Sequence, residues 1–183
     1  MTCNRPKVFG IGFHKTGTKS LASALETLGY RVHGPEWVRD AQACVSLQSL
    51  WVYASRVVDS YDAFQDNPWP LLWRELVARF PDARFILTVR DEAQWLDSAV
   101  RYFGSDATPM RRLIYGADAG SPIGNEDTYL ARYHQHNAEV RQALAGSKRF
   151  LEFDIASGEG WKPLCQFLEQ PIPSLPFPHA NRG

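Results

Sequence analysis

Apolar residues near the amino terminus change from a continuous run to a helical spacing. Residues 7–13 form a short, β-rich apolar run, after which Leu21, Leu25 and Leu28 recur at intervals of about a helical turn. Gly29 then provides a helix stop. The pattern predicts a strand, a loop and a helix, in that order.

The next part of the chain predicts two more elements. Residues 30–34 are expected to form a short second strand. Residues 35–49 are expected to form a helix opened by Pro35, because proline is favoured in the first helical turn. The residues on its roughly apolar side are Trp37, Ala41, Val45 and Leu47.

The middle of the chain carries the clearest strand. Residues 73–80 have apolar side chains at i, i+3, i+4 and i+7 and predict a helix that ends before Pro81. Residues 83–90 are a nearly continuous apolar run, which is typical of a strand covered on both faces in a parallel sheet. Asp91 and Gln94 resemble an N-cap and capping box for the next helix, whose core stripe contains Leu96, Ala99, Val100 and Phe103.

The carboxyl-terminal part begins with an irregular stretch. Residues 104–125 are rich in Gly, Pro, Ser and Asp, and we expect a mobile segment, a candidate lid, with one short helix at residues 110–115. Residues 127–144 then predict a long polar helix, residues 149–155 another strand, and residues 161–168 a final amphipathic helix.

Strands separated by helices predict an α/β fold in three layers, α/β/α, with a central parallel sheet like that of P-loop nucleotide hydrolases. Ligands in such folds bind at the carboxyl ends of the strands. A chain of 183 residues with no visible linker is expected to form a single domain, residues 1–183.

The charge and the cysteine content of the chain indicate which binding partners and which cellular compartment to expect. Twenty basic and twenty acidic residues cancel, so we expect neither nucleic acid nor an anionic membrane as a partner. Cys3, Cys44 and Cys165 are too few and too widely spaced for a disulfide framework or a usual zinc site. No apolar run is long enough to span a membrane. We expect a soluble, cytoplasmic protein.

The loop after the first predicted strand contains candidate anion-binding residues. Gly12 and Gly17 have the separation found in the pattern G-x-x-x-x-G-K-[ST], but Thr18 follows Gly17, and the lysines stand at Lys15 and Lys19. Backbone N–H groups and the positive end of the following helix predict a site for a tetrahedral anion. Lys15 adds a cation to this site, and Thr16, Thr18 and Ser20 add hydroxyl donors.

Lys15-Thr16-Gly17-Thr18 resembles the 5′-phosphosulfate loop of sulfotransferases that use 3′-phosphoadenosine-5′-phosphosulfate (PAPS). Those enzymes hold the 3′-phosphate with an Arg at a strand end and a Ser eight residues later, which is the spacing of Arg90 and Ser98. The resemblance extends to residues 64–68 (FQDNP), 79–91 (RFPDARFILTVRD) and 160–181 (GWKPLCQFLEQPIPSLPFPHAN), and so covers most of the chain.

The chain departs from the family pattern in two places. Phe80 replaces the usual Tyr, and no segment matches the basic, glycine-containing segment that helps hold the 3′-phosphate in larger cytosolic relatives. Arg182 is a candidate replacement for that segment.

The resemblance implies a sulfotransferase that moves a sulfuryl group from PAPS to a hydroxyl or amine of a small-molecule acceptor and releases adenosine 3′,5′-bisphosphate without a metal ion. It implies donor contacts from His14, Lys15, Thr16, Gly17, Thr18, Lys19, Ser20, Arg90 and Ser98. Lys15 suits the developing negative charge on the sulfonate and the bridging oxygen.

The transfer also needs a base. Asp66 matches the family position and is our first choice, with His14 and His33 as alternatives. His134 and His136 point to different sides of their helix, so no metal site is expected there. Five aromatic residues either line an apolar acceptor pocket or belong to the core: Trp37, Trp51, Tyr53, Trp69 and Trp73.

Two other functions remain as alternatives to the sulfotransferase. One is a P-loop nucleotide phosphotransferase or hydrolase, and the other is a nucleotide-binding module without catalysis. Magnesium distinguishes the first from sulfuryl transfer, since phosphoryl transfer relies on the metal. The sequence identifies neither the acceptor nor the oligomeric state.

Overall fold

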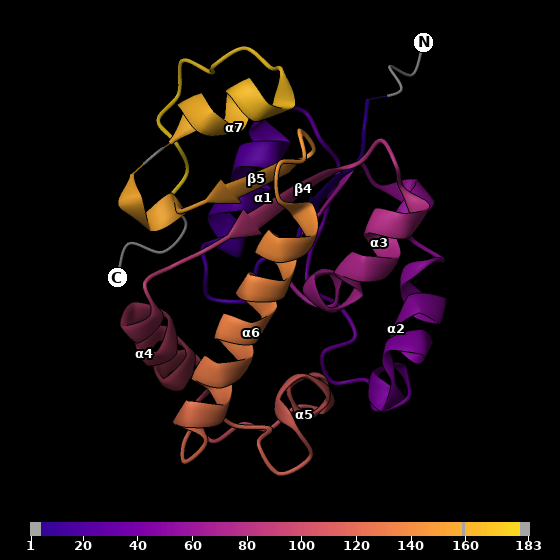
Figure 1. Cartoon of the computed structure of the whole chain (residues 1–183), viewed down its shortest axis with the longest axis vertical. Helices are drawn as coiled ribbons and strands as arrows, with labels where there is room; N and C mark the ends of the chain where they lie inside the picture. The colour runs from indigo at the N-terminus through magenta and orange to yellow at the C-terminus, as the bar shows by residue number, and fades with distance from the viewer. Residues whose placement is uncertain (1–4, 159, 180–183) are drawn as a thin grey trace.

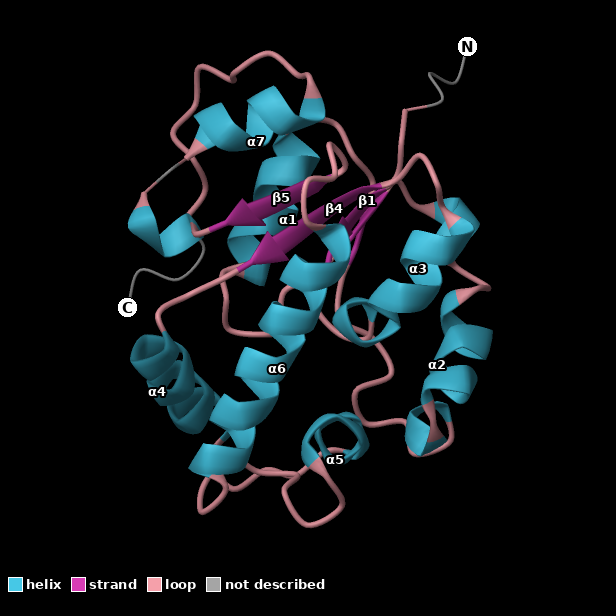
Figure 2. Cartoon of the chain, viewed as in Figure 1, coloured by secondary structure: helices cyan, strands magenta, loops and turns pink. Residues whose placement is uncertain are grey.

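A five-stranded sheet, parallel throughout, forms the centre of the molecule (Figures 1 and 2). The computed structural model describes residues 5–158 and 160–179. The strand order is β2-β3-β1-β4-β5. The strands are β1 (Val8–Gly10), β2 (Val32–His33), β3 (Ala63–Phe64), β4 (Arg84–Thr88) and β5 (Phe150–Phe153). The predicted α/β fold with a central parallel sheet is confirmed.

Helices cover both faces of this sheet. On one face lie α1 (Thr18–Thr27) and α7 (Trp161–Leu168), and on the other α2 (Leu47–Ala54), α3 (Trp73–Arg79) and α6 (Glu126–Leu144). Helices α4 (Glu92–Phe103) and α5 (Pro109–Tyr115) pack against α6 in the lower part of Figure 1. Short 3₁₀ turns occur at Ala43–Val45, Val58–Ser60, Trp69–Leu72 and Ile155–Ser157.

The alternation of side chains along the strands produces two hydrophobic cores. Phe9 and Phe85 point to the core shared with α3 and α6, while Val8 and Ile86 point to the core shared with α1 and α7. In β4, Phe85, Ile86 and Leu87 are all fully buried. This confirms the expectation of a strand with both faces covered.

The helix predicted for residues 35–49 is wrong. Trp37 has a left-handed backbone with φ of 55°, and Ser46 is extended with φ of −160°, so neither residue continues a helix. Helix α2 begins one residue later, where the Ser46 side chain accepts a hydrogen bond from the Ser49 N–H. Val45 and Leu47, assigned to the apolar side, are 72% and 50% exposed.

Strand β3 is an element that the sequence pattern did not predict. It contains only Ala63 and Phe64, which is too short for an alternation to be recognised. Yet it pairs with β1 on one side and β2 on the other, with Phe64 opposite Phe9 and His33. Its carboxyl end leads directly to Asp66.

Residues 104–125, for which we expected a mobile segment, place several side chains in the core of the protein. The short helix is confirmed as α5, and the Thr108 side chain caps it by accepting a hydrogen bond from the Arg111 N–H. Met110, Tyr115 and Ala119 are buried. The segment therefore contributes a wall to the neighbouring cavity.

Candidate active site

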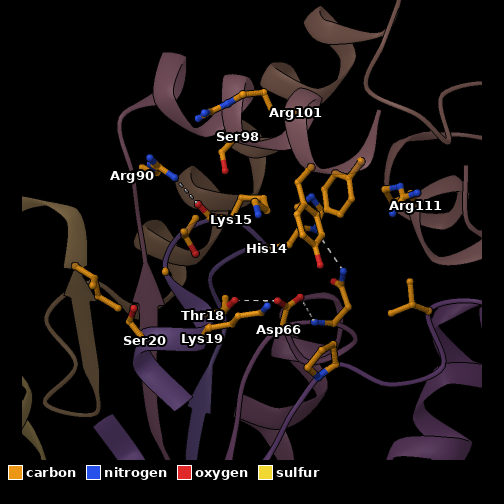
Figure 3. Close-up of a pocket in the computed structure, with 18 of the residues that line it drawn as sticks. His14, Lys15, Thr18, Lys19, Ser20, Asp66, Arg90, Ser98, Arg101 and Arg111 are labelled. Carbon is orange, nitrogen blue, oxygen red and sulfur yellow. Dashed lines mark hydrogen bonds between the residues drawn. The ribbon is translucent and has the colours of Figure 1, made fainter. Parts of the chain in front are cut away.

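A cavity of about 760 Å³ lies where the loops after β1, β3 and β4 meet (Figure 3). All ten residues of the predicted donor and catalytic set line this cavity: His14, Lys15, Thr16, Gly17, Thr18, Lys19, Ser20, Asp66, Arg90 and Ser98. His33, the alternative base, is not among the lining residues in the described ranges. The carboxyl ends of the strands thus bring the two predicted motifs together.

The loop after β1 lies tightly against β4. A Cβ atom on Gly12 would lie 2.2 Å from both the carbonyl oxygen and the Oγ1 atom of Thr88, so only glycine fits there. Thr16 Oγ1 lies 2.6 Å from Thr88 Oγ1 and donates to the Phe13 carbonyl oxygen. The Thr16 hydroxyl, predicted to contact an anion, therefore anchors the loop to the sheet.

Helix α1 begins at this loop, and its N-cap residue has no side chain that could cap it. Gly17 is the N-cap, with φ of 94°, a conformation that glycine adopts without steric cost. No side chain of the described residues forms a cap hydrogen bond there. N–H groups at the positive end of a helix bind phosphate and similar anions.

Lys15 projects from the loop into the cavity. Its Nζ atom lies 3.7 Å from the centre of the Tyr102 ring, a cation–π contact. Burial lowers the pKa of Lys15, the charge of Lys19 lowers it further, and the carboxylate of Asp66 opposes both effects. The Lys15 carbonyl oxygen accepts a hydrogen bond of 3.4 Å from Arg90 Nη1, which joins the two predicted motifs.

Asp66 faces the start of α1. Its Oδ2 atom accepts a hydrogen bond of 2.8 Å from Thr18 Oγ1, and its Oδ1 atom accepts one of 2.7 Å from the Asn67 N–H. Burial raises the pKa of Asp66, an effect that these hydrogen bonds and the charge of Lys15 reduce. A carboxylate with a raised pKa beside an anion site is suited to accept a proton.

The two histidine alternatives have other surroundings. His14 is buried, with its Nδ1 atom 3.3 Å from Asn67 Nδ2 and its Nε2 atom 2.9 Å from the Tyr115 hydroxyl. Burial, with the charges of Arg111 and Lys15, lowers the pKa of His14 to about 3, which makes it a weak base. His33 pairs with Glu36 at 2.7 Å, outside the cavity. The geometry favours Asp66 over both histidines.

A second wall of the cavity is formed by Arg90, Ser98 and Arg101, which lie close together in Figure 3. The main chain of Arg90 is held by the Tyr133 hydroxyl, which accepts from the Arg90 N–H and donates to the Arg90 carbonyl oxygen. The Arg90 Nε atom is buried and has no hydrogen-bond partner within the described part of the chain. An unpaired guanidinium nitrogen and a hydroxyl fit a phosphate ligand.

Sequence reasoning assigned no site role to several residues that line the cavity. Arg101 and Tyr102 follow Ser98 by three and four residues on α4, so helical spacing already placed them on the same side. Asn67 follows Asp66 within the segment FQDNP, whereas Arg111 carried no comparable signal, because it reaches the cavity only through α5.

The remaining candidates fall outside the cavity. Two of the five aromatic residues, Trp69 and Trp73, belong to the hydrophobic core, and the other three, Trp37, Trp51 and Tyr53, pack against it. His136 is buried and donates to the Ile11 carbonyl oxygen, whereas His134 pairs with Glu92 at the surface.

Among residues 5–158 and 160–179, no group of three or more His, Cys, Asp or Glu is arranged to hold a metal ion. Arg182 and Cys3 lie outside the described residues.

Comparison with known proteins identifies the family to which the chain belongs. The sequence model of the sulfotransferase domain family matches residues 7–183, and the chain belongs to this family. It is 28% identical over 214 residues to the Ava biosynthesis cluster protein M of Aspergillus versicolor, an alignment that covers 94% of this chain and 80% of the relative.

A solved structure supports the fold. The crystal structure of a sulfotransferase from Alicyclobacillus acidocaldarius matches with a TM-score of 0.59 and 16% sequence identity, over 94% of this chain and 84% of that one. The family assignment supports an enzyme that carries out sulfuryl transfer. No helix in the described ranges is both long and apolar enough to cross a membrane.

Proposed function

We propose that the chain is a PAPS-dependent sulfotransferase that transfers a sulfuryl group to a hydroxyl or amine of a small-molecule acceptor. The observation that carries the proposal is that one cavity brings together the uncapped start of α1, Lys15, Arg90 and the carboxylate of Asp66. A single domain over residues 1–183 and a cytoplasmic location, favoured by the few unpaired cysteines, belong to the same proposal.

The two ends of the donor would bind at different walls. The first N–H groups of α1, with Lys15, would hold the 5′-phosphosulfate, while Lys19 lies at the exposed edge of the same loop. Arg90 and Ser98 would hold the 3′-phosphate, which gives the buried Arg90 Nε atom the partner that it lacks.

The chemistry then needs only side chains that face one another in the cavity. Asp66 would take the proton of the acceptor hydroxyl while the acceptor oxygen forms a bond to sulfur. The bond between sulfur and the bridging oxygen breaks, and both electrons remain on the leaving 5′-phosphate. Lys15 would stabilise the charge on that oxygen. The products are the sulfated acceptor, the bisphosphate and a proton on Asp66.

The sequence of the loop after β1 argues against the phosphotransferase alternative. In P-loop nucleotide hydrolases the hydroxyl at the loop end binds Mg²⁺. Here Thr18 stands where that pattern has its lysine, and Lys19 stands where it has the hydroxyl. The arrangement is therefore better suited to a donor that needs no metal.

Titration calorimetry tests the proposal directly. Adenosine 3′,5′-bisphosphate is expected to bind with the same affinity with or without magnesium, and more tightly than ATP. A preference for magnesium-ATP would contradict the proposal. Failure of both ligands to bind would favour a module without nucleotide function.

Replacement of Arg90 tests the assignment of the two walls. Arg90→Ala should weaken the bisphosphate by about tenfold or more, because it removes a charge-assisted contact worth roughly 1.5–3 kcal/mol. Adenosine 5′-phosphosulfate lacks the 3′-phosphate and should lose little affinity. An equal loss for both nucleotides would show that Arg90 supports the loop through the Lys15 carbonyl oxygen instead.

A further inference from the structure

The cavity extends beyond Asp66 and His14, away from the proposed donor walls. We call this part the acceptor end, defined by Pro35, Val38, Arg39, Phe103, Asp106, Thr108 and Arg111. In Figure 3, Arg111 lies on the opposite side of His14 and Asp66 from Arg90 and Ser20. A group bound here would therefore approach Asp66 from the side away from the donor.

Arg111 is a buried cation in this end, with only 4% of the residue exposed. Its Nε atom donates to the Gly120 carbonyl oxygen at 3.0 Å, and its Nη2 atom donates to the main chain and side chain of Asp106. Its guanidinium carbon lies 4.3 Å from the centre of the Phe103 ring. The Arg111 side chain also hydrogen-bonds to the Tyr129 side chain. The guanidinium is thus fixed in place at the cavity wall.

The charges of the acceptor end do not cancel. Arg39 Nη2 and Arg111 Nη2 lie 2.7 Å and 3.1 Å from the same Asp106 oxygen, so two guanidinium groups share one carboxylate. Arg111 is buried, whereas the side chains of Arg39 and Asp106 are 73% and 43% exposed, so water solvates part of this charge. The three groups still leave one net positive charge at this end of the cavity, which attracts an anionic group of a ligand.

We propose that the acceptor bears a carboxylate, which binds to Arg111 and Arg39 while the acceptor hydroxyl faces Asp66. This inference rests on the proposed function. A planar, fixed guanidinium is well suited to a carboxylate. The apolar side chains of Pro35, Val38 and Phe103 line the same end and fit a compact apolar or aromatic body between the two polar groups.

Matched acceptor pairs test the inference. Each pair is a hydroxylated acid and its primary amide, which have nearly the same shape and differ in charge: para-hydroxybenzoate, para-hydroxyphenylacetate and the longer para-hydroxyphenylpropanoate, each with its amide. The measured quantity is the ratio of kcat/KM for the acid to kcat/KM for the amide. We expect a ratio of about ten to one hundred in at least one pair, the range for hydrogen bonds to a charged group.

Two variants should move this ratio in opposite directions. Arg39→Gln removes one cation and should lower it, whereas Asp106→Asn removes the competing carboxylate and should raise it. Arg111→Lys should bring it close to one, and if that variant fails to fold, the other two still decide. Arg101→Gln is the matched control: it removes an exposed cation from the donor side and should leave the ratio unchanged.

Several results would overturn the inference. They are the absence of an acid preference in every pair, a shift of Arg39→Gln and Asp106→Asn in the same direction, or weaker bisphosphate binding by Arg39→Gln. Calorimetry with the acids alone separates this inference from the proposed function. Binding of acid over amide without transfer from PAPS would remove only the proposed function, while bisphosphate binding without an acid preference would remove only the inference.

Discussion

Two residues of the candidate active site have left-handed backbones although neither is glycine. Lys15 has φ of 66° and Asp66 has φ of 61°. Such conformations cost roughly 1–3 kcal/mol each and persist where the surroundings hold them. Here Arg90 donates to the Lys15 carbonyl oxygen, and Thr18 and Asn67 donate to the Asp66 carboxylate. Both proposed reacting side chains are therefore held in position before any ligand binds.

Lys15 should act mainly in the transition state. Lys15→Ala is expected to slow single-turnover transfer from PAPS by about 10²–10³-fold, equivalent to roughly 3–4 kcal/mol, because it removes a preorganised positive charge. The affinity for the bisphosphate should fall far less. Rapid-quench measurement of transfer, together with calorimetry, compares the two effects.

Lys19 provides the control for this experiment. It is exposed in the first turn of α1, where the helix dipole mildly disfavours a cation, although it also lines the cavity. Lys19→Ala should therefore change the rate only slightly. If Lys19 proved essential and Lys15 dispensable, the loop would act like that of a nucleotide hydrolase, and the assignment of Lys15 would be wrong.

Asp66→Asn separates catalysis from stability. The variant keeps the shape of the side chain but cannot accept the proton, so transfer should fall by about 10²–10⁴-fold, the usual contribution of a general base. The pH–rate profile of the wild-type enzyme should rise with pH through the raised pKa of Asp66. An unchanged rate in the variant would exclude Asp66 as the base.

Relative to the wild type, the Asp66→Asn variant should gain stability as the pH rises. Because burial raises the pKa of Asp66, the folded protein binds this proton more tightly than the unfolded chain. Stability from this group is thus present below about pH 4, the usual pKa of aspartate, and is lost as the pH rises through the folded value. Asparagine has no such loss. Thermal melts across pH should show the difference in Tm moving in favour of the variant.

At the level of elements, the contact between the β1 loop and β4 depends on Gly12. Gly12→Ala would place a methyl group against the Thr88 backbone. Overpacking of this kind costs about 1–3 kcal/mol, which for a chain of this size lowers Tm by roughly 2–12 °C. Bisphosphate binding should weaken as well, because the displaced loop carries Lys15 and leads to Gly17.

Gly146→Ala is the matched substitution for that prediction. Gly146 has φ of 70°, but a Cβ atom there would have no heavy atom within 4 Å, so only backbone strain of about 1–2 kcal/mol is introduced. Its Tm should fall modestly while bisphosphate binding stays the same. Equal loss of binding in both variants would mean that general destabilisation, and not the loop contact, controls the site.

At the scale of the whole molecule, we predict that the two faces of the sheet unfold together. Cys44 lies in the core on the side of α2, and Cys165 in the core on the side of α7. Burial raises the pKa of the Cys44 thiol to about 11 and raises that of Cys165, so both should react slowly with thiol reagents in the native state. A Cys3→Ser background removes the remaining thiol.

Thiol reactivity during urea unfolding then tests this cooperativity. Cys44 and Cys165 should become reactive at one shared midpoint, which coincides with the loss of helical circular dichroism. Two separate midpoints would mean that the layers unfold independently, in contradiction to the proposed single domain.

Local sequence determined the parts of this protein whose residues are close together in the chain. The loop from Gly12 to Ser20, the strand that ends near Arg90 and the helix capped by Asp91 were all predictable, because glycine separation, apolar runs and capping patterns act within a few residues. The short strand β3 and the irregular backbone around Trp37 were not, since neither has a local periodicity.

Tertiary structure decided which side chains face one another. The sequence made Asp66 the first choice of base and left His14 and His33 as alternatives. In the fold, β3 directs Asp66 toward Thr18, while packing surrounds His14 with Asn67 and Tyr115. Arg111 joined the cavity only because α5 packs beside it. Burial and charge pairing depend on distances between segments far apart in sequence, and only the packed chain defines those distances.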